Sequence, residues 1–88
     1  MTFSPEDRAE IAEILRELAT ASRREPGCVT YIPHQVEGDP DTVLIYEQYR
    51  DAAALEAHGQ SEHFKKYAVG GLYQKMRERS REDLVALV

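Results

Sequence analysis

The sequence predicts an α+β protein in the order helix, strand, strand, helix, strand, which is a ferredoxin-like βαββαβ sandwich whose first strand is short or missing. Two changes of hydrophobic period carry this prediction. Apolar residues recur every three or four positions over 5–24, every second position over 28–36 and 42–49, and at helical spacing again after residue 51. Because 88 residues support only one core, we expect a single domain over 1–88.

The first helix has a start signal and a stop signal. Ser4 is suited to cap it, and Pro5 fits its first turn. Pro26-Gly27 ends it, because proline removes a backbone donor and glycine readily adopts a turn. The apolar stripe that this helix would bury consists of Ile11, Ile14, Leu15 and Leu18.

Two strands form a predicted hairpin at 28–36 and 42–49, joined by a five-residue polar link. The alternation in the first strand puts His34 and Tyr31 on opposite faces. Pro33 lacks an amide donor, so this strand lies at a sheet edge or contains a bulge.

The second half predicts two helices and a final strand. Asp51 caps a short helix that ends at Gly59, and Ser61 caps a longer one that Gly70-Gly71 interrupts. The tail at 82–88 is apolar on both faces, which is typical of a strand covered on both sides.

Only residues 1–3 precede the first helix, although this topology places its first strand in the centre of the sheet. Central backbone groups without partners would be costly. Three explanations are open: the natural start lies upstream, Thr2 and Phe3 form a very short strand, or another chain fills the gap.

The composition excludes several classes of protein. There are 16 acidic and 11 basic residues, and the net charge of −5 does not suit binding to phosphates of nucleic acid. The single cysteine, Cys28, cannot form an internal disulfide, and neither a leader peptide nor a long apolar run is visible. We expect a soluble cytoplasmic protein with no membrane or nucleic-acid partner.

Four motifs together resemble the antibiotic biosynthesis monooxygenase (ABM) family: EPGC at 25–28, YEQY at 46–49, ALEAH at 54–58 and SEHF at 61–64. The resemblance covers roughly 10–70 and implies a dimeric α+β barrel, in which the sheets of two ferredoxin-like protomers pair. A thin core and a sheet with only enough helix to cover one face agree with a homodimer.

Family members of known activity include cofactor-independent oxygenases of phenols, anthrones and quinols. The resemblance therefore implies a monooxygenase, without metal or flavin, that acts on a small aromatic quinol or polyphenol in a pocket between sheet and helices. Such a reaction needs an apolar pocket, a proton acceptor and donors for the phenolate. The alternative is a non-catalytic dimer of the same fold that binds a small ligand or serves a stress response.

The family also includes haem-degrading enzymes, whose pattern is broken here. The position four residues beyond Phe64, which holds their haem-ligating histidine, is Ala68, and the chain contains no tryptophan. Haem degradation is therefore disfavoured.

His34 is the predicted catalytic residue, because the unperturbed pKa of an imidazole suits proton transfer near neutral pH. The alternative is a histidine at an interface, hydrogen-bonded to backbone. The residues expected to bind substrate are His58, Tyr46, Tyr67, Phe64 and Tyr73. Of these, Phe64 fits a core position better than a substrate pocket, and the two tyrosines on the last helix need hydroxyl partners if they are buried.

His58 and His63 flank the break between the second and third predicted helices. This spacing is not that of a helical metal-binding pair, and no cysteine or carboxylate cluster completes a ligand set. We therefore predict no metal site and expect His63 to cap a helix end.

Tyr46 and Glu47 are neighbours in one strand, so only one of them can face a pocket on the helix side. Glu47 shares its face with Val43 and Ile45, where a carboxylate is either paired or buried with a raised pKa. We favour pairing across the dimer, with an arginine as the partner. Cys28 is expected to be a small packing residue.

Overall fold

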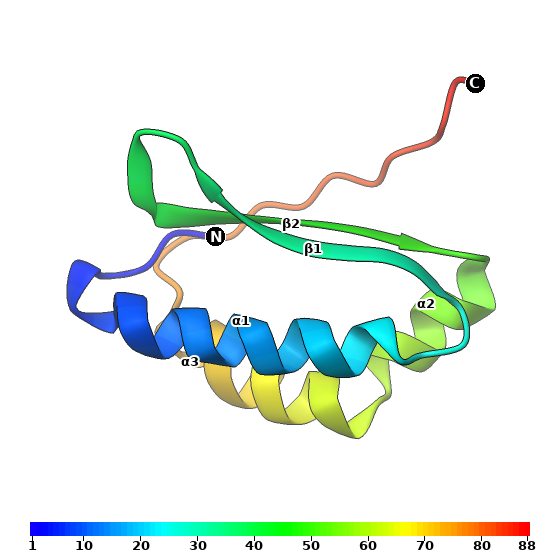
Figure 1. Ribbon diagram of the computed structural model, residues 1–88, viewed down its shortest axis with the longest axis horizontal. Helices are drawn as coiled ribbons and strands as arrows, with labels where there is room; N and C mark the ends of the chain where they lie inside the picture. The colour runs from blue at the N-terminus through cyan, green and yellow to red at the C-terminus, as the bar shows by residue number, and fades with distance from the viewer.

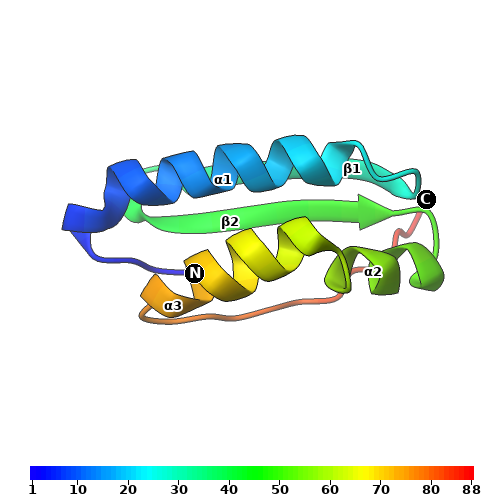
Figure 2. The ribbon, with the colours of Figure 1, turned by 90° about the horizontal axis from the view of Figure 1, so that it is seen from below.

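The computed structural model describes every residue from Met1 to Val88. Its elements are the 3-10 helix η1 (Pro5–Asp7), α1 (Arg8–Arg23), β1 (Cys28–Val36), β2 (Asp39–Tyr49), α2 (Ala52–Gly59), the π-helix η2 (Phe64–Leu72) and α3 (Tyr73–Lys75). All helices lie on one face of the β1–β2 hairpin, and the other face carries none (Figure 1). Figure 2 shows α1 and the η2–α3 segment side by side along the hairpin. The predicted ferredoxin-like α+β fold is confirmed.

The register of the hairpin decides which side chains reach the helices. Tyr31 pairs with Glu47, and His34 pairs with Leu44. Tyr31 and Val43 are buried against the helices, whereas His34 and Leu44 are exposed. Because side chains alternate along a strand, Glu47 points toward the helices and His34 points away from them.

The strand β1 is an edge strand, as Pro33 predicts, and its pairing shifts register between Cys28 and Thr30. The hairpin link is shorter than expected, since β2 begins at Asp39. Gly38 makes the tight turn with a φ of +80°, a conformation that favours glycine.

A very short first strand is present at the N-terminus. Thr2 forms a bridge to Thr42 of β2 on one side and to Glu78 on the other. Its position between them is that of the first strand in a βαββαβ sheet. The second of the three explanations above therefore agrees with the structure.

The strand predicted for 82–88 is wrong. Residues beyond Glu78 are exposed and pair with no strand, and they include Leu84 and Leu87. A final strand needs a first strand to pair with, and Thr2 offers its hydrogen bonds only to Arg77 and Glu78.

The core lies between α1, the hairpin and η2. Leu18 of α1 and Leu72 of η2 are each 1% exposed. The sequence predicts that Gly70 and Gly71 interrupt the last helix. This is wrong, because both glycines lie within the π-helix η2. A Cβ on Gly71 would come within 3.3 Å of Ile14, so the glycine lets η2 approach α1 closely.

The predicted caps of α2 and η2 are confirmed. The Asp51 carboxylate accepts a backbone N–H of α2 at 2.8 Å, and the Ser61 hydroxyl accepts the N–H of Phe64 at 3.2 Å. These caps set the break that holds His58 and His63. None of the helices has the length and apolar character needed to cross a membrane.

Candidate functional site

Three polar side chains from separate segments meet on the helix side of the sheet. Glu25 follows α1, His58 lies near the end of α2, and His63 directly precedes η2. Oε2 of Glu25 is 2.7 Å from Nδ1 of His58 and 2.5 Å from Nε2 of His63. An ionised carboxylate only accepts hydrogen bonds, so both ring nitrogens donate to the same oxygen.

The Pro26-Gly27 corner places Glu25 beside α2. Gly27 is buried, and a Cβ on it would lie only 2.3 Å from the Cβ of Ala54. The carbonyl of Gly27 also accepts the N–H of Arg50, which ties the corner to the end of β2 at 2.8 Å. Only glycine fits this close approach to Ala54, and the approach places the Glu25 carboxylate next to α2.

Aromatic rings surround the central imidazole. His58 is 3% exposed. Its neighbours, at ring-centroid distances of 5.0, 5.2 and 5.7 Å, are Tyr49, Phe64 and Tyr31. Tyr73 meets Phe64 edge-on at 6.1 Å. The imidazole is thus shielded from bulk water by aromatic rings, and hydrogen bonds and charges act more strongly there than in water.

Glu47 faces the second nitrogen of the same imidazole. Its Oε1 is 3.8 Å from Nε2 of His58. Burial raises the pKa of Glu47, and the neighbouring His58 opposes that shift. Within the chain this carboxyl therefore lies beside a histidine, and the charge of Arg81 also lowers its pKa. Pairing with an arginine across a dimer stays a prediction.

The hydroxyl of Tyr49 is buried and makes no hydrogen bond of normal geometry, although it lies close enough to the Glu47 carboxylate to lower the pKa of that group. Burial also raises the pKa of Tyr49 and of Tyr31, so both remain neutral phenols. A buried donor without a partner is uncommon and suits a ligand oxygen or a water molecule.

The arrangement can therefore accept a proton and stabilise an oxygen anion. The Nδ1–H of His58 is held by Glu25, which leaves Nε2 as the basic nitrogen. Orientation of an imidazole by a carboxylate is the usual way to position a general base. The ring of Tyr49 lies 5.0 Å from the imidazole, and its buried hydroxyl is a donor near Glu47.

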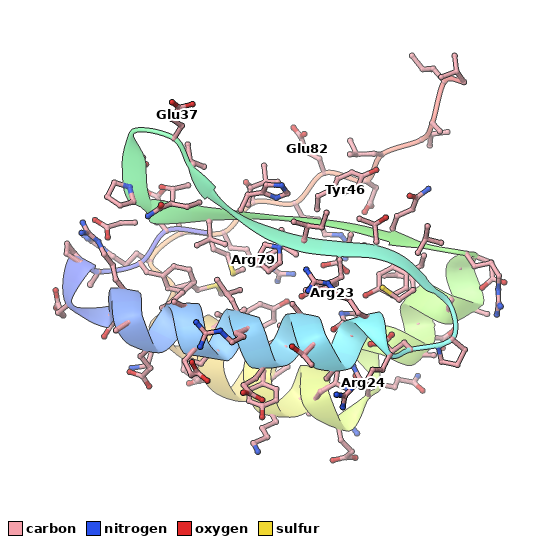
Figure 3. All side chains as sticks on the ribbon, viewed as in Figure 1. Arg23, Arg24, Glu37, Tyr46, Arg79 and Glu82 are labelled. Atoms are coloured by element: carbon pink, nitrogen blue, oxygen red, sulfur yellow. The ribbon has the colours of Figure 1, made fainter.

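The structure gathers some of the residues predicted to bind substrate and separates others. His58, Phe64 and Tyr73 lie in one aromatic group. Tyr67 lies on the π-helix η2, as Phe64 does, and is half-buried against the core. Tyr46 is 41% exposed and points away from the helices (Figure 3).

His34 lies apart from this group. It borders a groove of about 680 Å³ between α1 and the hairpin, and His58 is not among the residues that line it. The apolar lining of that groove includes Ile11, Leu15 and Val43. His34 therefore lies at the groove, whereas His58 lies among the aromatic rings.

Glu25 is the functional residue that the sequence analysis missed. The sequence analysis names it only as the first residue of the EPGC motif, although it is the acidic residue nearest the corner. The expected capping role of His63 is wrong, because its ring bonds Glu25 and its own side chain makes no cap hydrogen bond.

The chain belongs to the family described as "Antibiotic biosynthesis monooxygenase", which it matches over residues 1–69. The family resemblance drawn from the four motifs is thereby confirmed. Glu25, His58 and His63 all lie inside the matched region.

Relatives and solved structures agree with this assignment. "Putative monooxygenase YcnE" of Bacillus subtilis is 30% identical over 67 residues, which cover 76% of this chain and 70% of that protein. An uncharacterized Synechocystis protein, sll1783, is 30% identical over 63 residues, 72% of this chain but only 43% of its own length. A structure from Bacteroides thetaiotaomicron, titled a putative antibiotic biosynthesis monooxygenase, superposes with a TM-score of 0.90 at 31% identity, covering 100% of this chain and 84% of that one.

Replacement Glu47→Gln is expected to stabilise the protein at neutral and mildly alkaline pH. Burial raises the folded-state pKa of this carboxyl, so keeping it ionised costs folding free energy above that pKa. The cost disappears as pH falls through the raised pKa, so the gain should shrink between about pH 8 and about pH 4. Urea unfolding across this range, with EDTA present, measures the difference.

The matched control is Glu37→Gln at the hairpin tip, where the side chain points into solvent (Figure 3). It should leave stability unchanged across the range. If Glu47→Gln is less stable than the wild type at the alkaline end, burial is not the main influence on the pKa of Glu47, and the account of this carboxyl is wrong.

Proposed function

We propose that the protein is a monooxygenase that oxidises a small phenol or quinol beside His58, between the sheet and the helices. One observation carries the proposal: Nδ1 of a buried imidazole is held 2.7 Å from a carboxylate, while Nε2 is left as a base among aromatic rings. Membership of the ABM family and relatives named as monooxygenases support it.

The reaction begins with removal of a proton. Nε2 of His58 accepts the phenolic proton, and the Glu25 carboxylate stabilises the resulting imidazolium. The hydroxyl of Tyr49 donates to the phenolate oxygen. The phenolate is electron-rich enough to pass an electron to O₂.

The electrons of the oxidation all come from the substrate. One oxygen atom enters a ring carbon as a carbonyl oxygen, and the other leaves as water with two hydrogens from the phenol. A phenol thus becomes a quinone with no external reductant. The aromatic surroundings keep bulk water from the intermediate.

Oxygen uptake tests this function with a panel of phenols, anthrones and quinols. Uptake that depends on the protein is expected for at least one class, and His58→Gln should lower its rate by about 100-fold or more, the usual contribution of a general base. No protein-dependent uptake across the panel would contradict the oxygenase assignment.

The variant His34→Ala distinguishes His34 from His58 as the general base. His34 borders the groove between α1 and the hairpin, and His58 does not. Under the present proposal this variant retains the wild-type rate. If His34→Ala loses activity and His58→Gln retains it, the chemistry belongs to the groove and the assignment to His58 is overturned.

A non-catalytic role in binding a small ligand is the second candidate. The groove of about 680 Å³ favours it, because its lining is largely apolar and does not include His58. Ligand binding there, in a protein that consumes no oxygen, would support this role.

We further propose that two copies pair through the helix-free face of the hairpin. This face is bare of helices in Figure 1. Its exposed apolar side chains, each 38–55% accessible, are Ile32, Val36, Leu44 and Tyr46. A contiguous apolar face is unfavourable in water, and a second copy offers the same face in return.

Leu44→Lys is expected to convert a dimer into a monomer, because it places a charge in the centre of this face. Light scattering after size exclusion measures the mass. The matched control is Val69→Lys, which charges a similarly exposed apolar residue of η2 and should leave the dimer intact. A wild-type protein that is monomeric at all concentrations would contradict the pairing.

A further inference from the structure

We propose that Glu25, His58 and His63 form a binding site for a divalent transition-metal ion, with Zn²⁺ as the probe. A carboxylate oxygen, Nδ1 of His58 and Nε2 of His63 all lie within 4.8 Å of one another. The sequence predicts no metal here, because the two histidines lack a third ligand nearby in the chain. The fold supplies it from the corner after α1.

The donor set suits zinc chemistry. Two imidazole nitrogens and one carboxylate oxygen are a common three-ligand set for Zn²⁺, and they leave a fourth position for water. The same set holds other divalent metals with open positions. The two carboxylates near this point, Glu25 and Glu47, provide negative charge for a cation.

The geometry needs only a small adjustment. The two nitrogens are 2.7 and 2.5 Å from the carboxylate oxygen, as hydrogen bonds require. Ligands of a tetrahedral ion with bonds of about 2.0–2.1 Å lie roughly 3.3 Å apart, so each nitrogen must move less than about 1 Å away from the oxygen. The two nitrogens lie within 4.8 Å of one another and must approach by at most about 1.5 Å. Glu25 lies in a corner, and His58 and His63 lie in terminal turns of helices, so a shift of this size leaves the core in place.

Metal binding changes the tautomer of His58. In the metal-free chain its Nδ1–H donates to Glu25, and the ion must take that nitrogen's lone pair. The ring proton therefore moves to Nε2, which faces Oε1 of Glu47 at 3.8 Å. A ligating histidine that donates its other N–H to a carboxylate is the usual outer-shell arrangement of zinc sites.

This tautomer change has a consequence for the oxygenase proposed above. With its proton on Nε2, His58 has no free nitrogen to accept a proton from the substrate. Zn²⁺ at this site is therefore an inhibitor of that reaction. The metal site itself does not depend on the proposed reaction, because its test needs no substrate.

The test is a calorimetric titration of Zn²⁺ into the tag-free, chelator-stripped full chain. One ion per chain is expected, with a dissociation constant at or below about 10 µM. His63→Ala should weaken binding by at least about 100-fold, and Glu47→Gln, as an outer-shell partner, by about 10-fold. Co²⁺ in place of Zn²⁺ should give the visible absorption of a tetrahedral site.

The controls separate this site from adventitious binding. Glu62→Gln alters a carboxylate next to His63 whose side chain is 97% exposed, and it should bind Zn²⁺ as the wild type does. His63 is the most accessible of the three ligands, so its replacement is the one that best preserves folding, which circular dichroism checks.

The proposal is overturned if the wild-type chain does not bind one Zn²⁺ ion. It is also overturned if His63→Ala binds Zn²⁺ as tightly as the wild type does. Either result leaves the oxygenase proposal standing, because oxygen uptake is measured separately in EDTA. Conversely, a protein that consumes no oxygen but binds Zn²⁺ with the expected variant effects supports the metal site alone.

Discussion

One partly buried carboxylate oxygen, Oε2 of Glu25, holds together three segments that are distant in the chain. It accepts a hydrogen bond from His58 and another from His63. Hydrogen bonds to a charged group contribute about 1.5–3 kcal/mol each, and an unpaired buried partner costs a similar amount. The corner after α1, the end of α2 and the start of η2 therefore behave as one unit, which positions the imidazole under the sheet.

The chemistry of the site depends on which nitrogen of His58 carries the proton. With the proton held toward Glu25, the ring presents a base to the aromatic surroundings, close to the unpaired hydroxyl of Tyr49. With the proton toward Glu47, the ring offers its other nitrogen as a metal ligand. Glu25 contacts His58 in both states, and binding of a metal ion selects between them.

Local signals in the sequence predict local structure well here. The caps at Asp51 and Ser61 form as expected, and Pro33 lies in an edge strand. Alternation shows that His34 and Tyr31 lie on opposite faces, but not which face meets the helices. The contact of Glu25 with His58 spans 33 positions, and no periodicity encodes it. The tail strand fails because its partner is a tertiary feature, the first strand, which is bridged only at Thr2.

The ring tautomers of His58 and His63 test the central claim most directly. Nitrogen-15 NMR of labelled, metal-free protein at mildly alkaline pH distinguishes protonated from bare ring nitrogens. The bond to Glu25 predicts a proton on Nδ1 of His58 and on Nε2 of His63, with both signals lost or moved in Glu25→Gln. A bare Nδ1 in His58, with the proton on Nε2, would contradict the shared carboxylate.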